Sequence, residues 1–295
     1  MTTCPDANVL AELADDALDE PSRAAVESHL DDCAACTELV ATFAWIVAPP
    51  PRSPPGYELL APLGARSWQV GDGIAVTYGA RCAPGLVAVR HPNLAAVLAV
   101  GEIDGQPYVV HEYFARTERE WRDVEPRSLD EIALVWRGVL AGLAALHRGG
   151  LAHGQISPDR VFVDGDRVVL GAPVTELAAT SGYLAPERLD GASASALADQ
   201  FGVCAAAWEA LAGHAAYSGT TIGALLVATA SPPELPERAD RRLAVLARGL
   251  APTPRDRYRD VDALATALAR PRRPLVAIAL VLAVIAATAL VIALR

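Results

Sequence analysis

Five prolines within nine residues, in the segment APPPRSPPG at 48–56, divide this chain of 295 residues into two parts. Proline lacks a backbone donor and clashes with the preceding helical turn, so this segment favours an extended connector over a helix. The residues before it are too few to be stabilised by an apolar core alone, whereas residues 57–270 suffice for one large domain. The sequence therefore predicts two folded units joined by a linker at 47–56.

The first unit, residues 1–46, is predicted to be helical. The runs ANVLAELADDAL and PSRAAVESHLDDCAACTELVATFAWIV place apolar residues at helical spacing. Pro21 opens the second run, at a position that suits the first turn of a helix. A unit of this size needs an additional stabilising element, such as a metal ion.

Four residues of this unit have the spacing and chemistry of a structural zinc site. His29, Cys33 and Cys36 form the pattern H-x3-C-x2-C, and Cys4 supplies a fourth ligand from the preceding segment. Thiolates and an imidazole suit tetrahedral Zn²⁺. An odd total of five cysteines, three of them grouped beside a histidine, favours metal binding over a disulfide framework. Ordinary buried cysteines and a redox-sensing thiolate site remain the alternative interpretations.

This pattern resembles the zinc-finger domain of zinc-binding anti-sigma factors, with Cys4 followed by His29, Cys33 and Cys36. The resemblance covers residues 1–46. In that family the module is a helical platform that docks a protein partner, often a sigma factor. The resemblance therefore implies that this chain binds a protein through the same module.

The second unit, residues 57–270, begins with short strands and continues with helices from about residue 128. Its ordered landmarks resemble those of bacterial Ser/Thr protein kinases: YELLAPLG at 57–64, HPNL at 91–94, GQPYVVHEY at 105–113, LAALH at 143–147, APE at 185–187, DQFG at 199–202 and RDRY at 255–258. The resemblance implies an α+β, two-lobed fold with a β-rich N-lobe at 57–114 and a helical C-lobe at 115–270. Only 26 residues separate Gly64 from His91, so we expect a truncated N-lobe without most of the regulatory helix.

The residues that perform phosphoryl transfer in this family are replaced here. The catalytic loop reads HGQISPDR at 153–160, the metal-binding D-F-G is matched by APV at 172–174, and the chain contains no lysine. Phosphoryl transfer depends on a positioned lysine, a catalytic aspartate and carboxylate or amide ligands for Mg²⁺. The resemblance therefore predicts no catalytic residue and makes ATP and Mg²⁺ binding doubtful. The degenerate positions are Thr77 for the lysine, Gln155 for the base, Ser157 for the loop lysine, and Arg160 and Ala172 for the metal ligands.

Three structural residues of the family are retained. Glu187 and Arg257 match the buried pair between the A-P-E segment and the late helices, and Asp199 matches the aspartate that caps the catalytic loop. Retention of these residues without the catalytic ones is what we expect of a scaffold.

The end of the chain is predicted to span a membrane. Residues 274–294 contain no charge over 21 residues, which as a helix is about 31 Å, close to the hydrocarbon thickness of a bilayer. Arg270, Arg272 and Arg273 precede this run, and by the positive-inside rule they keep the domains before it in the cytoplasm. We expect a single-pass protein of the inner (cytoplasmic) membrane, anchored by this helix.

These features together predict a membrane-tethered pseudokinase, not an enzyme, that regulates or assembles protein partners. A sigma factor or a protein of a kinase pathway is the expected partner. A net charge of -10 disfavours nucleic-acid binding. Two other hypotheses stay open: a zinc-binding anti-sigma-like transcription regulator, and an atypical active Ser/Thr kinase that binds ATP.

Overall fold

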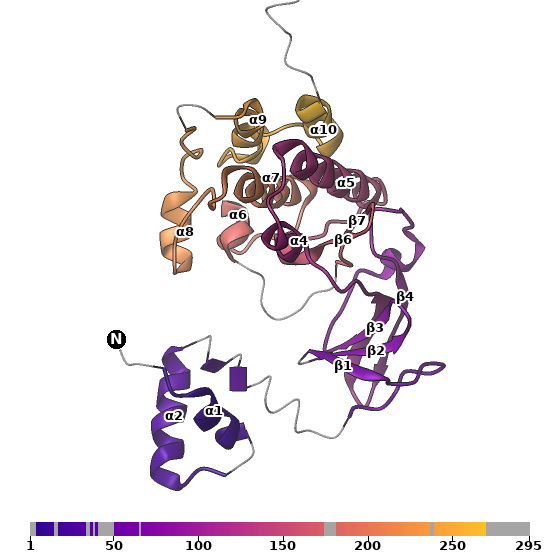
Figure 1. Cartoon of the computed structure of the whole chain (residues 1–295), viewed down its shortest axis with the longest axis vertical. Helices are drawn as coiled ribbons and strands as arrows, with labels where there is room; N and C mark the ends of the chain where they lie inside the picture. The colour runs from indigo at the N-terminus through magenta and orange to yellow at the C-terminus, as the bar shows by residue number, and fades with distance from the viewer. Residues whose placement is uncertain are drawn as a thin grey trace, which may run out of the picture.

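The structure is a computed structural model. It describes residues 4–14, 17–33, 36–37, 39–40, 50–64, 66–173, 181–236 and 239–269. Figure 1 shows a helical part at the N-terminal end, a β-rich lobe, and a larger helical lobe.

The N-terminal unit contains helices α1 (Ala7–Ala14) and α2 (Glu20–Asp32). Asp19 caps α2 by accepting a hydrogen bond of 2.9 Å from the backbone N–H of Ser22. Leu10, Val26 and Cys36 are the buried residues of its core, and this core is separate from those of the two lobes. A unit of fewer than fifty residues is marginally stable without an additional element such as a metal site.

The β-rich lobe is a five-stranded antiparallel sheet. Its strands are β1 (Ala61–Gly64), β2 (Ser67–Gly71), β3 (Ile74–Tyr78), β4 (Val97–Ile103) and β5 (Gln106–Glu112). They are ordered β1-β2-β3-β5-β4, so the central strand β3 lies between β2 and β5. One sheet face packs Val76, Tyr78 and Val110 in its own cluster, while Val109 on the other face joins the main core.

The connection from β3 to β4 carries no α-helix, and every residue from 79 to 96 in it is described. It contains only the 3-10 helix η1 (Pro84–Ala88). Leu86 of this turn is buried in the main core. The short N-lobe expected from the sequence is therefore present, with a tight turn where a long helix would need more residues.

The helical lobe begins at α4 (Glu118–Val124) and α5 (Leu129–Arg148). Both helices open with capping boxes, formed by Thr117 with Glu120 and by Ser128 with Glu131. A hairpin and five further helices follow: β6 (Val161–Asp164), β7 (Arg167–Leu170), α6 (Pro186–Leu189), α7 (Ala196–Ala212), α8 (Ile222–Ala228), α9 (Arg241–Gly249) and α10 (Val261–Ala269). The 3-10 turns are η2 (Pro158–Arg160), η3 (Ser181–Tyr183) and η4 (Pro254–Asp256).

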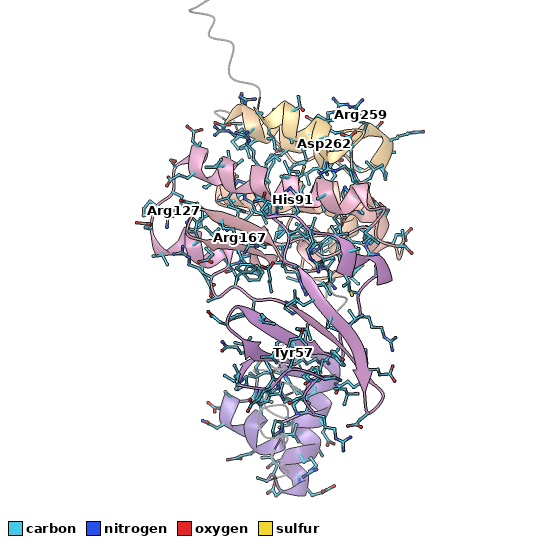
Figure 2. All side chains as sticks on the ribbon, turned by 90° about the vertical axis from the view of Figure 1, so that its right-hand side faces the viewer. Tyr57, His91, Arg127, Arg167, Arg259 and Asp262 are labelled. Carbon is cyan, nitrogen blue, oxygen red and sulfur yellow. The ribbon has the colours of Figure 1, made fainter. Side chains whose placement is uncertain are left out.

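The core of this lobe is built around α7. Nearly every residue of α7 from Ala198 to Ala210 is buried, and α7 packs against both α5 and α9. Trp136 of α5 and Trp208 of α7 are among the largest fully buried side chains. Figure 2 places Tyr57 in the β-rich lobe and Arg259 and Asp262 at the far end of the helical lobe.

The membrane prediction requires a correction. Within the described part of the chain, no helix has the length and apolar character needed to cross a bilayer. The predicted span at 274–294 lies outside the described residues. The transmembrane helix, the membrane contact and the inner-membrane location expected from the sequence are therefore withdrawn.

Candidate functional site

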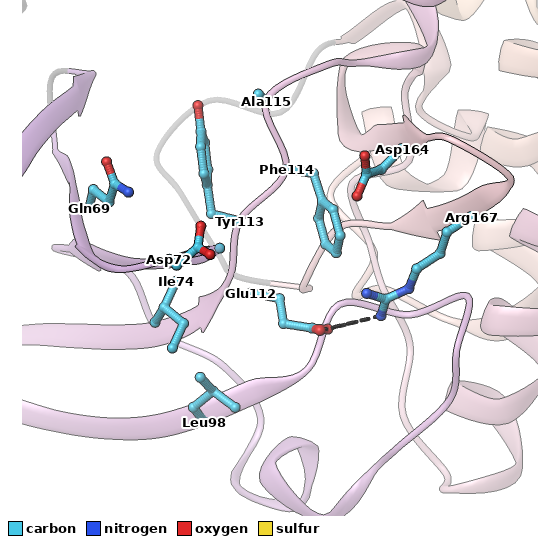
Figure 3. A pocket seen from close by; sticks show the side chains of 11 residues that line it. Gln69, Asp72, Ile74, Leu98, Glu112, Tyr113, Phe114, Ala115, Asp164 and Arg167 are labelled. Atoms are coloured by element: carbon cyan, nitrogen blue, oxygen red, sulfur yellow. Dashed lines mark hydrogen bonds and ion pairs between the residues drawn. The ribbon is translucent and has the colours of Figure 1, made fainter.

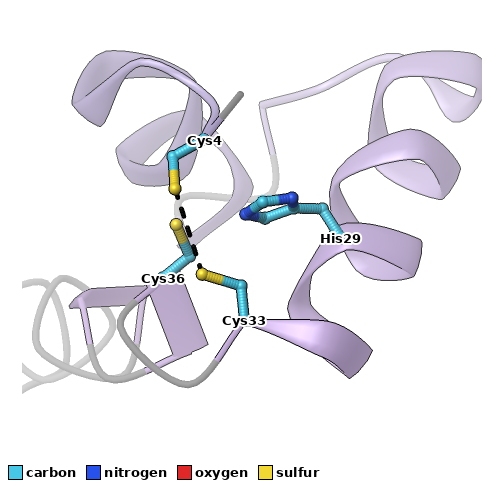
Figure 4. A group of neighbouring side chains, drawn as sticks. All are labelled: Cys4, His29, Cys33 and Cys36. Carbon is cyan, nitrogen blue, oxygen red and sulfur yellow. Dashed lines mark hydrogen bonds between the residues drawn. The ribbon is translucent and has the colours of Figure 1, made fainter. Parts of the chain in front are cut away.

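The N-terminal unit brings four metal-ligating side chains to one point. Cys4 precedes α1, His29 lies in the last turn of α2, Cys33 caps the end of α2, and Cys36 follows it. One ligand atom from each lies within 4.8 Å of the others, and the Sγ atoms of Cys4 and Cys33 are 4.0 Å apart. Zn–S bonds of about 2.3 Å would place tetrahedral ligands about 3.8 Å apart. Figure 4 shows the three sulfur atoms and the imidazole converging on that point.

The environment of these side chains also fits a metal ion. The buried Nε2 of His29 has no hydrogen-bond partner among the described residues, which is unfavourable unless a ligand satisfies it. A hydrogen bond from the backbone of Cys36 lowers the pKa of the Cys33 thiol to about 7. Burial raises the pKa of the Cys36 thiol to about 12. A bound cation would stabilise the deprotonated form of both thiols, so the cluster is consistent with structural Zn²⁺.

In the helical lobe, Asp199 organises the loop that matches the catalytic loop of kinases. Its carboxylate accepts hydrogen bonds of 2.7 Å from the backbone N–H groups of both His153 and Gly154, and it lies 2.9 Å from Nε2 of His147. His153 is buried and its Nε2 lies 3.0 Å from the carbonyl oxygen of Gly171. Burial lowers the pKa of His153 to about 4, so the ring is neutral. The loop and the segment before Ala172 are thereby fixed together.

The loop positions that carry chemistry in kinases lie in this framework. Gln155 is half-buried, and its backbone N–H lies 3.3 Å from Nδ1 of His153. Ser157 is buried at the start of η2, and Arg160 is half-buried at its end. Ala172 is buried and lies beyond β7. A small pocket of about 150 Å³ adjoins Gln155 and His153.

Thr77 lies in β3, and its side chain is hydrogen-bonded within the sheet. Its side chain is 3% exposed and lies 2.9 Å from the hydroxyl of Ser67 and 3.0 Å from Nε2 of His111. Nδ1 of His111 lies 2.7 Å from the carbonyl oxygen of Glu112, which can only accept, so Nδ1 carries the proton. In the neutral ring Nε2 then accepts from Thr77, and Thr77 accepts from Ser67. Sequence reasoning did not foresee the roles of Ser67 and His111.

Glu187, which is half-buried, forms an ion pair with the buried Arg257. Two parallel hydrogen bonds of 2.7 and 2.8 Å join the guanidinium to the carboxylate, and the Arg257 side chain is fully buried. This pair ties α6 to the segment after η4. The structure thus brings together Glu187 and Arg257, and separately Asp199 and the loop.

A second group of charged side chains was missed from the sequence. Arg119 of α4 contacts Asp159 of η2, Tyr183 of η3 and Glu209 of α7. Asp159 is exposed at the surface and pairs with Arg119. No spacing rule links residues 40 to 90 positions apart, so no sequence signal could have found this cluster.

A larger pocket, of about 620 Å³, lies where β5 leads into the helical lobe (Figure 3). The residues from Glu112 to Ala115, the β2–β3 turn and the β6–β7 turn form its walls. Arg167 lies 3.3 Å from the Glu112 carboxylate at its edge. Among the described residues, its lining includes none of the five degenerate kinase positions. This pocket is therefore distinct from the loop that matches the catalytic loop.

Comparisons with known proteins agree with both parts of this architecture. Residues 9–37 match the family described as "Putative zinc-finger". The Ser/Thr protein kinase PknL of Mycobacterium tuberculosis is 29% identical over 209 residues, covering 60% of this chain and 51% of the kinase. PknE of the same species is 28% identical over 198 residues, covering 58% of this chain and 34% of the kinase. The solved kinase domain of PknI from Mycobacterium tuberculosis has a TM-score of 0.55 at 22% identity, covering 72% of this chain and 94% of that domain.

The fold is therefore that of a protein kinase, preceded by a zinc-finger module. The sequence resemblance to bacterial Ser/Thr protein kinases is confirmed, as is the resemblance of residues 9–37 to a zinc finger. The chain spans between a third and a half of the length of these two curated relatives.

Proposed function

We propose that this chain is a pseudokinase that regulates or assembles other proteins by binding them and does not transfer phosphate. The observation that carries the proposal is the set of side chains at the five positions where kinases place charge and metal ligands. These are Thr77, Gln155, Ser157, Arg160 and Ala172. Phosphoryl transfer depends almost entirely on positioned charge, so their loss removes the basis of the reaction.

The local contacts support this interpretation. Thr77 is neutral, buried and hydrogen-bonded within the sheet, and the chain has no lysine that could neutralise phosphate charge there. The methyl group of Ala172 offers no ligand for Mg²⁺. Arg160 stands at the sequence position where kinases carry a ligand for Mg²⁺, and a guanidinium there would repel the metal ion. ATP and Mg²⁺ binding is for these reasons doubtful.

The contacts that shape the lobe support a binding role. Asp199 fixes the loop backbone, and Glu187 with Arg257 joins the segments around α7. These residues maintain a kinase-shaped surface that a partner can recognise. The replacement of the catalytic residues and the retention of the structural residues together favour a scaffold over an enzyme.

The zinc module supports a second candidate, an anti-sigma-like transcription regulator. Its four ligands converge, and residues 1–46 contain ten acidic residues and one arginine, which accounts for nearly all of the net charge of -10. Such a module suits a basic protein surface. We propose that it docks the partner, whether a sigma factor or a protein of a kinase pathway. Release of that partner upon removal of zinc is the test of this role.

The experiment that tests the pseudokinase proposal is incorporation of radiolabelled phosphate from ATP by the full chain, with Mg²⁺ or Mn²⁺. We expect incorporation no higher than in a mock purification. The double variant Gln155→Asp with Ala172→Asp should also stay at background, because Arg160 remains and no lysine is restored.

The contrary outcome would identify an atypical active Ser/Thr kinase that binds ATP. Incorporation by the wild-type chain that rises with protein concentration, and that is absent from the mock purification, would refute the proposal. Melting temperatures with and without ATP and Mg²⁺ separate nucleotide binding from catalysis, since a bound ligand stabilises the folded state. We expect no shift.

A further inference from the structure

The proline-rich segment at 50–56 is held against the β-rich lobe. The Tyr78 hydroxyl of β3 donates a hydrogen bond of 2.8 Å to the carbonyl oxygen of Arg52. Pro54 is buried, although the residues on either side of it are exposed. Tyr57, just after the segment, packs against the hydrophobic cluster that contains Tyr78. Because Pro54 lies between two residues that contact this cluster, we infer that its buried ring faces the same side of the sheet.

The backbone of this segment is restricted by its own sequence. Four of the six residues at 50–55 are prolines. A proline ring fixes φ and keeps the residue before it extended, so the segment favours a polyproline II conformation. The Tyr57 N–H donates to the Pro54 carbonyl at 3.0 Å, and Gly56 has a φ of 83°, as the third position of a type II turn requires. Binding such a segment orders few additional bonds, and its carbonyls have no internal hydrogen-bond partners.

The sheet face that carries Tyr78 is rich in aromatic side chains. The Tyr78 and Tyr108 rings lie 6.4 Å apart between centroids, and both side chains are buried. A Cβ at Gly101 of β4 would collide with the Tyr108 ring, so glycine lets this ring lie against the strand. Trp68 packs against the same cluster, and its buried Nε1 has no hydrogen-bond partner among the described residues. A buried donor without an acceptor is unfavourable, so this face has a donor available for a ligand carbonyl.

Charge contributes little to this contact. The Arg52 guanidinium lies 3.4 Å from the carboxylate of Asp104, and the two side chains are 78% and 67% exposed. Exposed pairs of this kind contribute little free energy. The buried proline ring and the hydrogen bond to a backbone carbonyl remain as the main contacts. Aromatic surfaces with hydrogen-bond donors bind proline-rich segments through these same two features.

We propose that the sheet face formed by Trp68, Tyr78, Gly101 and Tyr108 is a recognition surface for proline-rich segments, which this chain occupies with its own residues 50–55. The partner class is a polypeptide with prolines separated by two residues, in polyproline II conformation. A tethered occupant competes at an effective concentration in the millimolar range, so a partner binds only by displacing it. The inference goes beyond the pseudokinase proposal and depends neither on phosphate transfer nor on zinc.

The test is to disable the chain's own segment and supply it in solution. The full-length double variant Pro51→Ser with Pro54→Ser should bind a labelled synthetic peptide of residues 48–56, with a Kd on the order of 0.1 mM. The wild-type chain should bind it at least about tenfold more weakly, because its own segment competes. No binding to the double variant, or equal binding to both chains, would overturn the proposal.

A control peptide separates proline recognition from attraction to an acidic chain. It carries alanine at the positions of Pro51 and Pro54 and keeps the arginine. We expect its binding to the double variant to be at least about tenfold weaker, since it lacks the preformed conformation and the proline ring. Equal affinity for the two peptides would show that charge alone attracts them and would contradict the proposal.

The role of the Tyr78 hydroxyl is tested by one further substitution. Adding Tyr78→Phe to the double variant should weaken peptide binding about 2- to 10-fold, the usual effect of losing one hydrogen bond. The matched control is Tyr217→Phe, because the buried Tyr217 donates to the Leu250 carbonyl at 3.1 Å in the helical lobe. That control should leave the Kd unchanged, and equal losses in the two variants would count against the assigned surface.

Should the double variant not fold, tryptic cleavage after Arg52 in otherwise intact chains supplies the comparison. A segment held on the sheet is cleaved slowly, so Tyr78→Phe should be cut there several-fold faster than the wild type or Tyr217→Phe. Excess peptide in which glutamine replaces the arginine should accelerate this cut in the wild type, whereas its alanine counterpart should not. Equal rates in the three chains, or equal effects of the two peptides, would refute the proposal.

Discussion

Arg257 donates all five of its guanidinium hydrogen bonds inside the helical lobe. Two go to Glu187, and the other three go to the carbonyl oxygens of Leu197, Ala251 and Pro252. Its guanidinium also lies over the Phe201 ring, 5.1 Å from the centroid. The buried guanidinium of Arg257 is tolerated because all of its donors are satisfied. Loss of Glu187 would leave this buried charge uncompensated and destabilise the lobe.

His153 provides a pH-dependent prediction at the same scale. Burial lowers its pKa from 6.5 to about 4 in the folded state. Between those values the unfolded chain binds the proton and the folded chain does not, so stability falls as pH decreases from about 6.5 to 4. The shift corresponds to roughly 3 kcal/mol at most over that window. Unfolding by denaturant should therefore show a steeper loss of stability in the wild-type chain than in His153→Gln.

The carboxyl of Glu118 also contributes to the pH dependence of stability in this range. Burial raises the pKa of its carboxyl from 4.5 to about 7, so its contribution is present at low pH and lost as the pH rises through 7. The informative quantity is accordingly the difference between the two chains at each pH. Identical slopes for the wild type and His153→Gln between pH 6.5 and 4 would contradict the prediction.

Helix α5 approaches the loop at 91–94 so closely that one position requires glycine. A Cβ at Gly142 would collide with the carbonyl group of Asn93. The Asn93 side chain cannot withdraw freely, because its Nδ2 donates to the Val168 carbonyl at 2.7 Å. This contact joins the helical lobe to the segment between η1 and β4.

Gly142→Ala should therefore destabilise the protein by about 1–3 kcal/mol, because an added methyl group overpacks this contact. The matched variant Gly223→Ala adds the same methyl group on α8, where it meets nothing within 4 Å. It should stabilise the protein by about 0.5 kcal/mol. Chemical denaturation of both variants checks the difference. Equal effects of the two substitutions on stability would contradict the close contact between Gly142 and Asn93.

The molecule as a whole has separate hydrophobic cores. Leu10, Val26 and Cys36 form the core of the zinc module, and none of them belongs to the clusters of the two lobes. A module of this length is expected to unfold when its metal is removed, while the kinase-fold domain keeps its own packing.

Chelation should consequently affect one part of the molecule. Adding a strong zinc chelator to the full chain should abolish a calorimetric transition of the zinc module and leave the main transition within about 2 °C. Cys33→Ser should reproduce this result and release a partner docked on the module. One transition that moves as a unit upon chelation would contradict the independence of the two parts. Stoichiometric zinc retained by Cys33→Ser would contradict the ligand set.

The zinc-finger module and the resemblance to the kinase fold could both be predicted from the sequence. His29, Cys33 and Cys36 are close in sequence, and the identities of these residues and of Cys4 limit the chemistry that they can perform. The kinase landmarks occur in a fixed order, and the absence of lysine is independent of any fold. Hydropathy of the apolar run at 274–294 led to the prediction of a membrane helix; none of the helices in the described part of the chain could cross a bilayer, and the run itself lies outside that part.

Which distant side chains meet follows from the three-dimensional packing. Ser67, Thr77 and His111 join because β3 lies between β2 and β5, and Arg119 meets Glu209 because α4 lies beside α7. Short-range periodicity reports which face of an element is apolar, but it carries no information about which polar groups on other elements become neighbours. That pairing is set by chain topology and by burial, since a polar group removed from water must find its partner within the fold.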